Sequence, residues 1–137
     1  MLDTMRHLGI DYGTKYIGLA ISDEDGKMGF PHAVIPNNEE VVDTLLSLIQ
    51  KEEVGVVVMG ESRHNDGSAN KIFEASKDLA QKISEHAGVS VEFEPEFYTT
   101  KQARDAQELA GKTAERADAI AAAIILSSYL EKHGNHR

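Results

Sequence analysis

Residues 5–22 read MRHLGIDYGTKYIGLAIS, and this stretch does most to decide which fold we expect. Residues 5–10 and 16–22 are short, apolar and rich in residues that favour β-strands, and residues 11–15 between them contain Gly13. This pattern predicts a β-hairpin. An Asp-Gly pair at residues 25–26 favours the positive φ of a tight turn, so residues 28–35 are expected to form a third antiparallel strand.

Two amphipathic helices are expected in the middle of the chain. Apolar residues recur at helical spacing in residues 38–52, and Asn37 or Asn38 is the expected N-cap. The same spacing returns in residues 72–87, where Gly88 stands at the position of a C-terminal cap. Each helix therefore has one apolar face available to cover a sheet.

Further strands and helices complete the predicted order. Residues 54–59 are almost continuously apolar, as in a strand covered on both faces, and residues 89–93 alternate as the next strand. A Thr and a Gln in capping-box spacing open a helix over residues 99–111, and a last helix is expected over residues 113–133. The prediction is an α/β fold in one domain, residues 1–137, with three antiparallel strands followed by two parallel strands in one mixed sheet flanked by helices.

Composition restricts the classes of function. The 137 residues contain no cysteine, so any metal must be held by oxygen or histidine ligands. The formal charge of −9 argues against a generic nucleic-acid-binding module, which needs clustered Lys and Arg. The sequence shows neither a secretory leader nor a run of 18 apolar residues, so we expect a cytoplasmic protein without a membrane partner.

Acidic residues follow all three strands that should run parallel. Asp11 follows the first strand, Glu61 the fourth and Glu96 the fifth. Ligands bind beyond the carboxyl ends of such strands, so these carboxylates are expected to gather at one edge of the sheet. Taken singly, each is also explained as an ordinary loop acid, because acids are common in loops.

Asp118 is a fourth carboxylate of interest. It shares a helical face with Ala121, Ala122, Ile125 and Tyr129, which predicts that it points inward. A buried carboxylate requires a compensating metal, Arg or helix cap. The alternative is that Asp118 lies in the first turn of its helix at the surface, where the helix dipole favours an acid.

The turn at residues 11–15 resembles a phosphate-binding turn. Gly13 lets the backbone approach a ligand closely, and Lys15 can reach an anionic oxygen. Actin-like kinases and related ATPases use similar turns, but they need two lobes and a much longer chain. The short chain argues against that class.

Four segments together resemble the YqgF family of Holliday-junction resolvase-like and ribosomal-RNA-processing nucleases. They cover nearly the whole chain in the family's order: GIDYGTKYIGLAISD at residues 9–23, VVMG at 57–60, EFYTT at 96–100 and ADAIAAAIIL at 117–126. The resemblance implies a ribonuclease H-like fold. It also implies a divalent-metal nuclease site made of Asp11, Glu96 and Asp118.

Such a site predicts specific ligands and substrates. Oxygen ligands suit Mg²⁺ or Mn²⁺, and two ions together would support phosphodiester hydrolysis. By similarity to RuvC-type resolvases, Glu61 is either a fourth ligand or a solvated loop acid. The expected substrate is structured RNA or branched DNA, and symmetric cleavage of a four-way junction would call for a homodimer.

Six basic residues are candidates to guide phosphates, although each alone fits an ordinary surface charge: Lys15, Arg63, Lys71, Lys101, Arg104 and Arg116.

Three departures from the family pattern keep other functions open. Glu61 stands where the family has an apolar residue, Phe97 stands where it has an Arg that precedes the Thr-Thr pair, and the segment between Thr100 and Asp118 is shorter and poorer in Lys and Arg than is usual. The acidic charge, Phe97 and this segment also fit a non-catalytic protein of the same fold that binds nucleic acid or another protein. A third reading is a hydrolase of nucleotides or small phosphate esters that uses the same edge.

Overall fold

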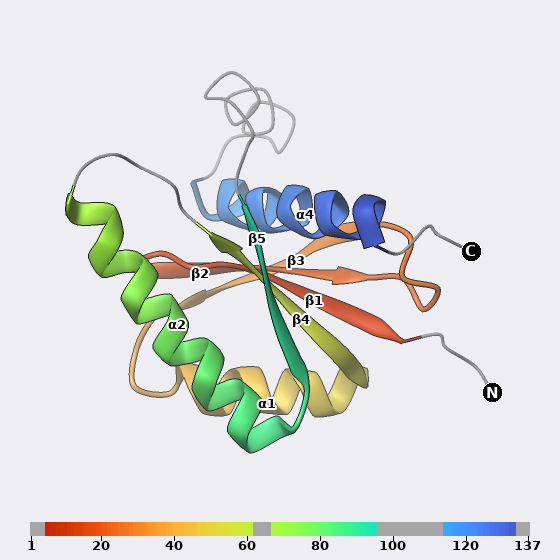
Figure 1. Cartoon of the computed structure of the whole chain (residues 1–137), viewed down its shortest axis with the longest axis horizontal. Helices are drawn as coiled ribbons and strands as arrows, with labels where there is room; N and C mark the ends of the chain where they lie inside the picture. Colours follow the sequence, from red (N-terminus) through yellow and green to blue (C-terminus); the bar gives the residue numbers. More distant parts are fainter. Residues whose placement is uncertain (1–4, 62–66, 96–113, 134–137) are drawn as a thin grey trace.

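The computed structural model describes residues 5–61, 67–95 and 114–133 and contains a single five-stranded sheet (Figure 1). The strand order in the sheet is β3-β2-β1-β4-β5. The strands are β1 (Arg6–Asp11), β2 (Tyr16–Ser22), β3 (Gly29–Pro36), β4 (Val54–Glu61) and β5 (Ser90–Pro95).

The sheet is mixed, as the sequence predicted. β2 pairs antiparallel with both β1 and β3, whereas β4 pairs parallel with both β1 and β5. Ile10 of β1 lies beside Met59 of β4, which lies beside Phe93 of β5. The carboxyl ends of β1, β4 and β5 therefore meet at one edge of the sheet.

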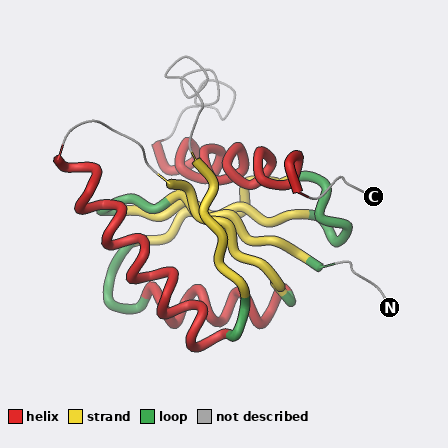
Figure 2. The backbone as a smooth tube through the Cα atoms, in the orientation of Figure 1, coloured by secondary structure: helices red, strands yellow, loops and turns green. Residues whose placement is uncertain are grey.

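Helices cover both faces of this sheet. α1 (Val41–Glu52) and α2 (Gly67–Ala87) pack on one face, and α4 (Ala114–His133) crosses the other (Figures 1 and 2). The two faces belong to separate apolar clusters, because side chains alternate along each strand. For example, Val57 belongs to the α1 and α2 cluster and Val58 to the α4 cluster.

Large side chains fill the layer beneath α1 and α2. Leu45 and Ile49 of α1 and Leu79 and Ile83 of α2 enter a buried cluster with residues from the strands. The strand residues are Leu8, Ile10, Ile17, Leu19, Val54, Val57 and Met59. This cluster is the larger of the two apolar clusters.

Small residues line the layer beneath α4. A Cβ atom built on Gly9 would lie 2.8 Å from the Leu126 Cβ and 2.9 Å from the Ala122 carbonyl oxygen. A Cβ on Gly29 would lie 3.0 Å from the same Leu126 side chain. Contacts this short force a neighbour to move, so glycine is what allows α4 to lie so close to the sheet.

The start of α1 differs from the prediction. The expected helix over residues 38–52 begins only at Val41, and its N-cap is Glu40, which makes no side-chain capping bond. The Asn38 side chain instead accepts a hydrogen bond from the Glu40 N–H in the preceding turn, at 2.9 Å. The Asn37 side chain bonds to the β1–β2 turn, so a tertiary contact replaces the predicted cap.

The start of α2 at Gly67 also differs from the predicted residue 72, whereas the remaining described ends are closer to the predictions. Gly88 has φ +71° and donates its N–H to the Ser84 carbonyl, as expected of a C-terminal cap. β4 and β5 each run two residues further than predicted, because Glu61 still pairs with Pro95. The helix expected over residues 99–111 lies outside the described residues.

Candidate active site

Asp11 and Glu61 occupy the carboxyl edge of the sheet. Asp11 is the last residue of β1 and Glu61 the last residue of the adjacent strand β4, and both are half-buried. Each therefore belongs to its strand and does not follow it in a loop, so the ladder orients both residues. Both acids reach the predicted edge, but strand alternation puts Asp11, which follows Ile10, on the α4 face and Glu61, two residues after Met59, on the α1 and α2 face.

Helix α4 brings Asp118 to the same edge. The cross-strand partner of Asp11 is Gly18 of β2, and a Cβ atom on Gly18 would collide with the backbone carbonyl of Asp118. The backbone of Asp118 therefore lies over Gly18, on the face of the sheet covered by α4, next to the strand that carries Asp11. Of the three acids expected to bind metal, Asp11 and Asp118 are described, and both lie at this edge of the sheet.

The environment of Asp118 is unfavourable for a negative charge. Its residue is half-buried near the start of α4, and burial raises the pKa of the Asp118 carboxyl above its usual value. Half-burial lies between the inward position and the surface position that the sequence left open. A cation beside the carboxylate would offset the cost.

The turn between β1 and β2 is held in a fixed conformation. A Cβ on Gly13 would collide with the Tyr16 carbonyl oxygen, so the tight approach requires glycine. Asn37 donates from its side chain to the Gly13 carbonyl and from its backbone N–H to the Lys15 carbonyl, each at 2.9 Å. Lys15 itself is exposed, which leaves it accessible to an anion. Sequence reasoning identified Asn37 only as a possible cap and missed this tether.

Several predicted residues are not placed. Glu96, Arg63, Lys101 and Arg104 lie outside the described residues, and the side chain of Arg116 is likewise not described. Lys71 is exposed on α2. Among the described residues, no three His, Asp or Glu side chains are grouped so as to hold a metal ion, so the full predicted set is not assembled within this part of the chain.

Glu94 of β5 is a buried acid near this edge that sequence reasoning did not select. Its residue is only 2% exposed, and its Oε2 accepts hydrogen bonds from Lys132 Nζ at 2.6 Å and Ser128 Oγ at 3.0 Å. Both donors belong to α4. The alternation of β5 places Glu94 on the face opposite Phe93, but it gives no sign that α4 would cover it.

Comparison with known proteins identifies the family. The RuvX family model, described as Holliday junction resolvase, matches residues 5–132, which is nearly the whole chain. This chain belongs to the RuvX family. The resemblance to the YqgF family, stated above from the sequence motifs, is thereby confirmed.

Curated relatives of this RuvX member carry the name "Putative pre-16S rRNA nuclease". The protein of Streptococcus thermophilus is 33% identical over 137 residues, covering 93% of this chain and 99% of its own. The protein of Anaeromyxobacter sp. is 32% identical over 142 residues, covering 96% and 99%. The similarity therefore extends over essentially the full length of both partners.

Solved structures show the same fold as this RuvX chain. T. thermophilus RuvC in complex with Holliday junction substrate superimposes with a TM-score of 0.61 at 17% identity, covering 96% of this chain and 97% of RuvC. The Fowlpox virus resolvase, in complex with Holliday junction DNA, gives a TM-score of 0.57 at 14% identity, covering 93% and 98%. The expected ribonuclease H-like fold is confirmed.

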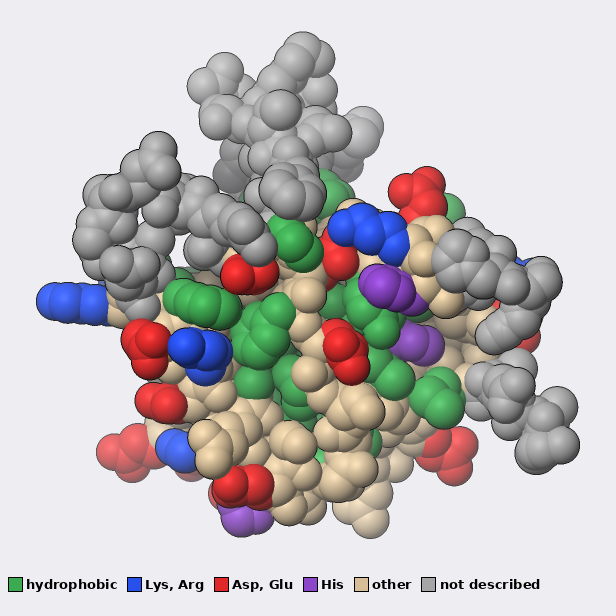
Figure 3. Space-filling view, viewed as in Figure 1, with side chains coloured by type: hydrophobic (Ala, Val, Ile, Leu, Met, Phe, Trp, Pro, Cys, Tyr) green, Lys and Arg blue, Asp and Glu red, His purple; other side chains and the backbone are tan. Residues whose placement is uncertain are grey.

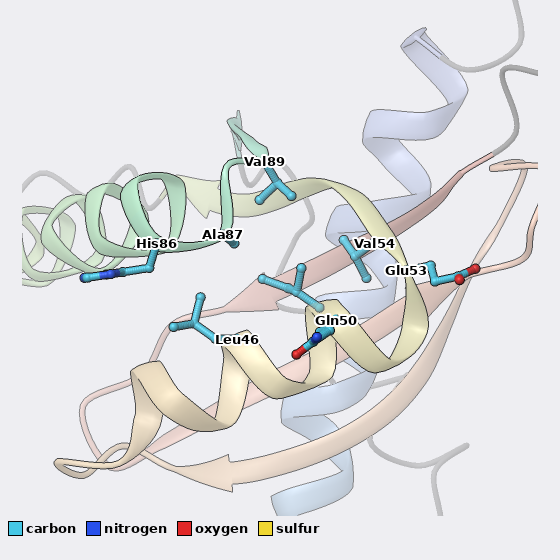
Figure 4. A pocket seen from close by; sticks show the side chains of 8 residues that line it. Leu46, Gln50, Glu53, Val54, His86, Ala87 and Val89 are labelled. Carbon is cyan, nitrogen blue, oxygen red and sulfur yellow. The ribbon is translucent and has the colours of Figure 1, made fainter.

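A cavity lies at the other end of the RuvX sheet. It has a volume of about 480 Å³ and is bordered by the C-terminal halves of α1 and α2, by the first residue of β4 and by Val89, which precedes β5 (Figure 4). Leu46, Gln50, His86, Val54 and Val89 are among its lining residues. Because it adjoins the amino ends of the parallel strands, this cavity is separate from the edge that carries Asp11 and Glu61.

The surface of the described residues is mixed in charge. Figure 3 shows acidic side chains spread over the displayed face, and its Lys and Arg side chains lie apart from one another. None of the helices in the described part of the chain has the length and apolar character needed to cross a membrane.

Proposed function

We propose that this protein is a divalent-metal-dependent endonuclease that hydrolyses phosphodiester bonds in structured nucleic acid. The observation that supports the proposal is the close approach of α4 to Gly18, the ladder partner of Asp11, because it puts Asp118 at the same edge of the sheet. Two acids at such an edge repel each other unless cations lie between them. The nuclease names of the curated relatives support the same chemistry.

The donor set fits a hard divalent cation. Asp11 and Asp118 offer only oxygen ligands, and the chain has no cysteine to favour a softer metal. Asp11, Asp118 and Glu96 would hold Mg²⁺ or Mn²⁺, with two ions in the full site, and Glu61 would add a ligand only by reaching round the end of β4. When bound, such ions activate a water and stabilise the charge of the leaving oxygen.

The remaining residues of the edge would bind and orient the substrate. The Asn37 hydrogen bonds hold the β1–β2 turn, so that the exposed Lys15 is presented to a phosphate. Arg63 and Arg116 are proposed to contribute further phosphate contacts. Residues 96–118 hold four basic and five acidic residues, so this segment contributes only −1 to the total charge of −9. The acid excess therefore resides mainly outside it, and the total charge does not fix where the basic residues lie.

The substrate that we favour is a structured ribosomal-RNA precursor, because the curated relatives are named for pre-16S rRNA. Branched DNA is the second substrate to test, because the matched solved structures hold Holliday junctions. Cleavage of a junction on two strands would require a homodimer with two-fold symmetry. The cysteine-free composition fits a cytoplasmic setting for either reaction.

Replacement of the strand-end acid tests the proposal. Asp11→Asn should reduce Mn²⁺-dependent cleavage of structured RNA or of a four-way junction at least about 100-fold, because the metal supplies several kcal/mol of transition-state stabilisation. Asp78→Asn on the exposed surface of α2 is the matched control and should cleave like the wild type. Binding without cleavage, unaffected by metal or by Asp11→Asn, would identify a non-catalytic binding protein instead.

A further inference from the structure

We propose that Glu94 is a positioning residue of the nuclease site. Its bonds to Lys132 and Ser128 would hold the end of β5 and helix α4 in the one relative position that brings the metal-binding acids together. The inference rests on the proposed nuclease function and assigns a new role within that site. Glu94 itself is not proposed as a ligand.

The bonds of Glu94 form a compact clamp between a strand and a helix. Ser128 and Lys132 are one helical turn apart, so both side chains reach the same oxygen from one face of α4. The Glu94 side chain is 3% exposed, whereas that of Lys132 is 47% exposed. A charge buried this deeply needs its partners, because removal of one leaves an uncompensated carboxylate.

In the described part of the chain, the buried apolar cluster around α4 does not connect this helix to β5. The buried cluster around α4 draws its strand residues from β2 and β4, namely Ala20 and Val58, with Val56 packed against it. No β5 residue belongs to that cluster as described. Among the described residues, the polar contacts of Glu94 thus provide specific anchors between β5 and α4.

Two of the predicted metal-binding acids depend on these elements. β5 ends at Pro95 and leads directly to Glu96, while α4 carries Asp118. In sequence, residues 96–113 separate the strand from the helix, and a connection of that length restrains the distance between its ends only weakly. Glu94 lies before this connection, and its partners Ser128 and Lys132 lie after it. Their hydrogen bonds therefore limit how far apart Glu96 and Asp118 can lie.

A charged pair has two properties that suit this role. The pair is directional: Glu94 on β5 and Lys132 on α4 meet in only one relative position of the two elements. Apolar side chains, in contrast, can exchange one contact for another when the elements slide. Lys132 also neutralises Glu94, so that this acid does not compete with the neighbouring acids for a cation. The reversed pair should therefore restore the clamp, whereas loss of either partner should not.

The test compares Glu94 with its exposed neighbour on the same face of β5. Glu94→Ala should lower Mn²⁺ affinity about tenfold and kcat on structured RNA between about tenfold and 100-fold, as expected when residues that support metal ligands are lost, with KM changed less than twofold. Glu92→Ala, two residues earlier, should leave all three values within twofold of wild type. The double variant Glu94→Lys with Lys132→Glu should recover most of the loss.

Controls separate positioning from folding. All variants are measured well below their unfolding temperatures. If the alanine variant does not fold, Glu94→Gln replaces it, because the amide oxygen can still accept both hydrogen bonds. This variant should lose two- to fivefold in Mn²⁺ affinity and in kcat. Unchanged Mn²⁺ affinity and kcat in folded Glu94 variants would overturn the inference, even if their unfolding temperatures fall. If the wild type binds Mn²⁺ but cleaves nothing, the nuclease function fails and the affinities still test the clamp. If the wild type binds no Mn²⁺, both proposals fail.

Discussion

The two faces of the sheet are built for different purposes. Towards α1 and α2 the strands present large apolar side chains, among them Leu8, Ile10 and Met59, all fully buried. Towards α4 the same strands present Gly9 and Gly18, where even a methyl group would strike the helix. Adjacent residues of one strand, such as Leu8 and Gly9, therefore belong to layers of very different thickness.

This difference separates stability from site geometry. Burial of large apolar side chains stabilises the fold at roughly 25 cal/mol per Å² and tolerates any well-packed arrangement. The thin layer contributes less apolar area, but it lets α4 lie close enough to place Asp118 over Gly18, the ladder partner of Asp11. Substitutions in the thick layer should mainly change the free energy of unfolding, and those in the thin layer should mainly change function.

Leu8→Ala, in the thick layer, should have the largest effect on stability. The side chain is fully buried, so its truncation should lower the free energy of unfolding by about 2–5 kcal/mol. Urea denaturation measures this loss. At temperatures where the variant is folded, its Mn²⁺ affinity should match the wild type, and a large drop in affinity would contradict the separation of the two faces.

Gly18→Ala, in the thin layer, should reverse that pattern. The added methyl group meets the Asp118 backbone, so we expect a loss of about 1–3 kcal/mol together with a loss of metal-dependent cleavage. Gly88→Ala is the matched control, because Gly88 has φ +71° and open space around it, and only the backbone conformation costs about 1 kcal/mol. Equal cleavage by the two variants would contradict the role of close packing.

Asp118→Asn should have the smallest effect on stability, and it should raise the free energy of unfolding, whereas the two preceding variants lower it. Because burial raises the pKa of Asp118, the folded state binds the proton of this carboxyl more tightly than the unfolded state does. The protonated carboxyl therefore stabilises the fold at low pH, and this stabilisation is lost as the pH rises through the raised pKa. Without metal at pH 7, the variant should be more stable by less than about 1 kcal/mol, since solvent screens part of the cost. The gain should vanish near pH 3, and chemical denaturation at both pH values measures it. A destabilised variant at pH 7 would contradict the pKa direction.

Much of the fold could be predicted because its signals are local. Strand alternation, helical spacing and the Asp25-Gly26 turn specified the elements, and the rules for crossovers made the strands after the hairpin parallel. These features depend on residues close together in the sequence.

The missed features depend on tertiary contacts. Glu61 and Pro95 remain in the ladder because they pair with each other, which neither segment reveals alone. Asn37 bonds to the Gly13 carbonyl from a distant part of the chain, so a helix-cap signal led to the wrong role. Glu94 looks like a solvated strand acid until α4 is placed over it. No periodicity of one segment contains that information.

Calorimetric titration of Mn²⁺ tests most directly whether α4 and β1 together form a cation site. The wild-type protein should bind Mn²⁺, and Asp118→Asn should weaken that affinity at least about tenfold while the folded state persists. Wild-type binding that is unchanged in Asp118→Asn, or no binding by the wild type, would show that the approach of Asp118 to Asp11 serves packing and not metal chemistry.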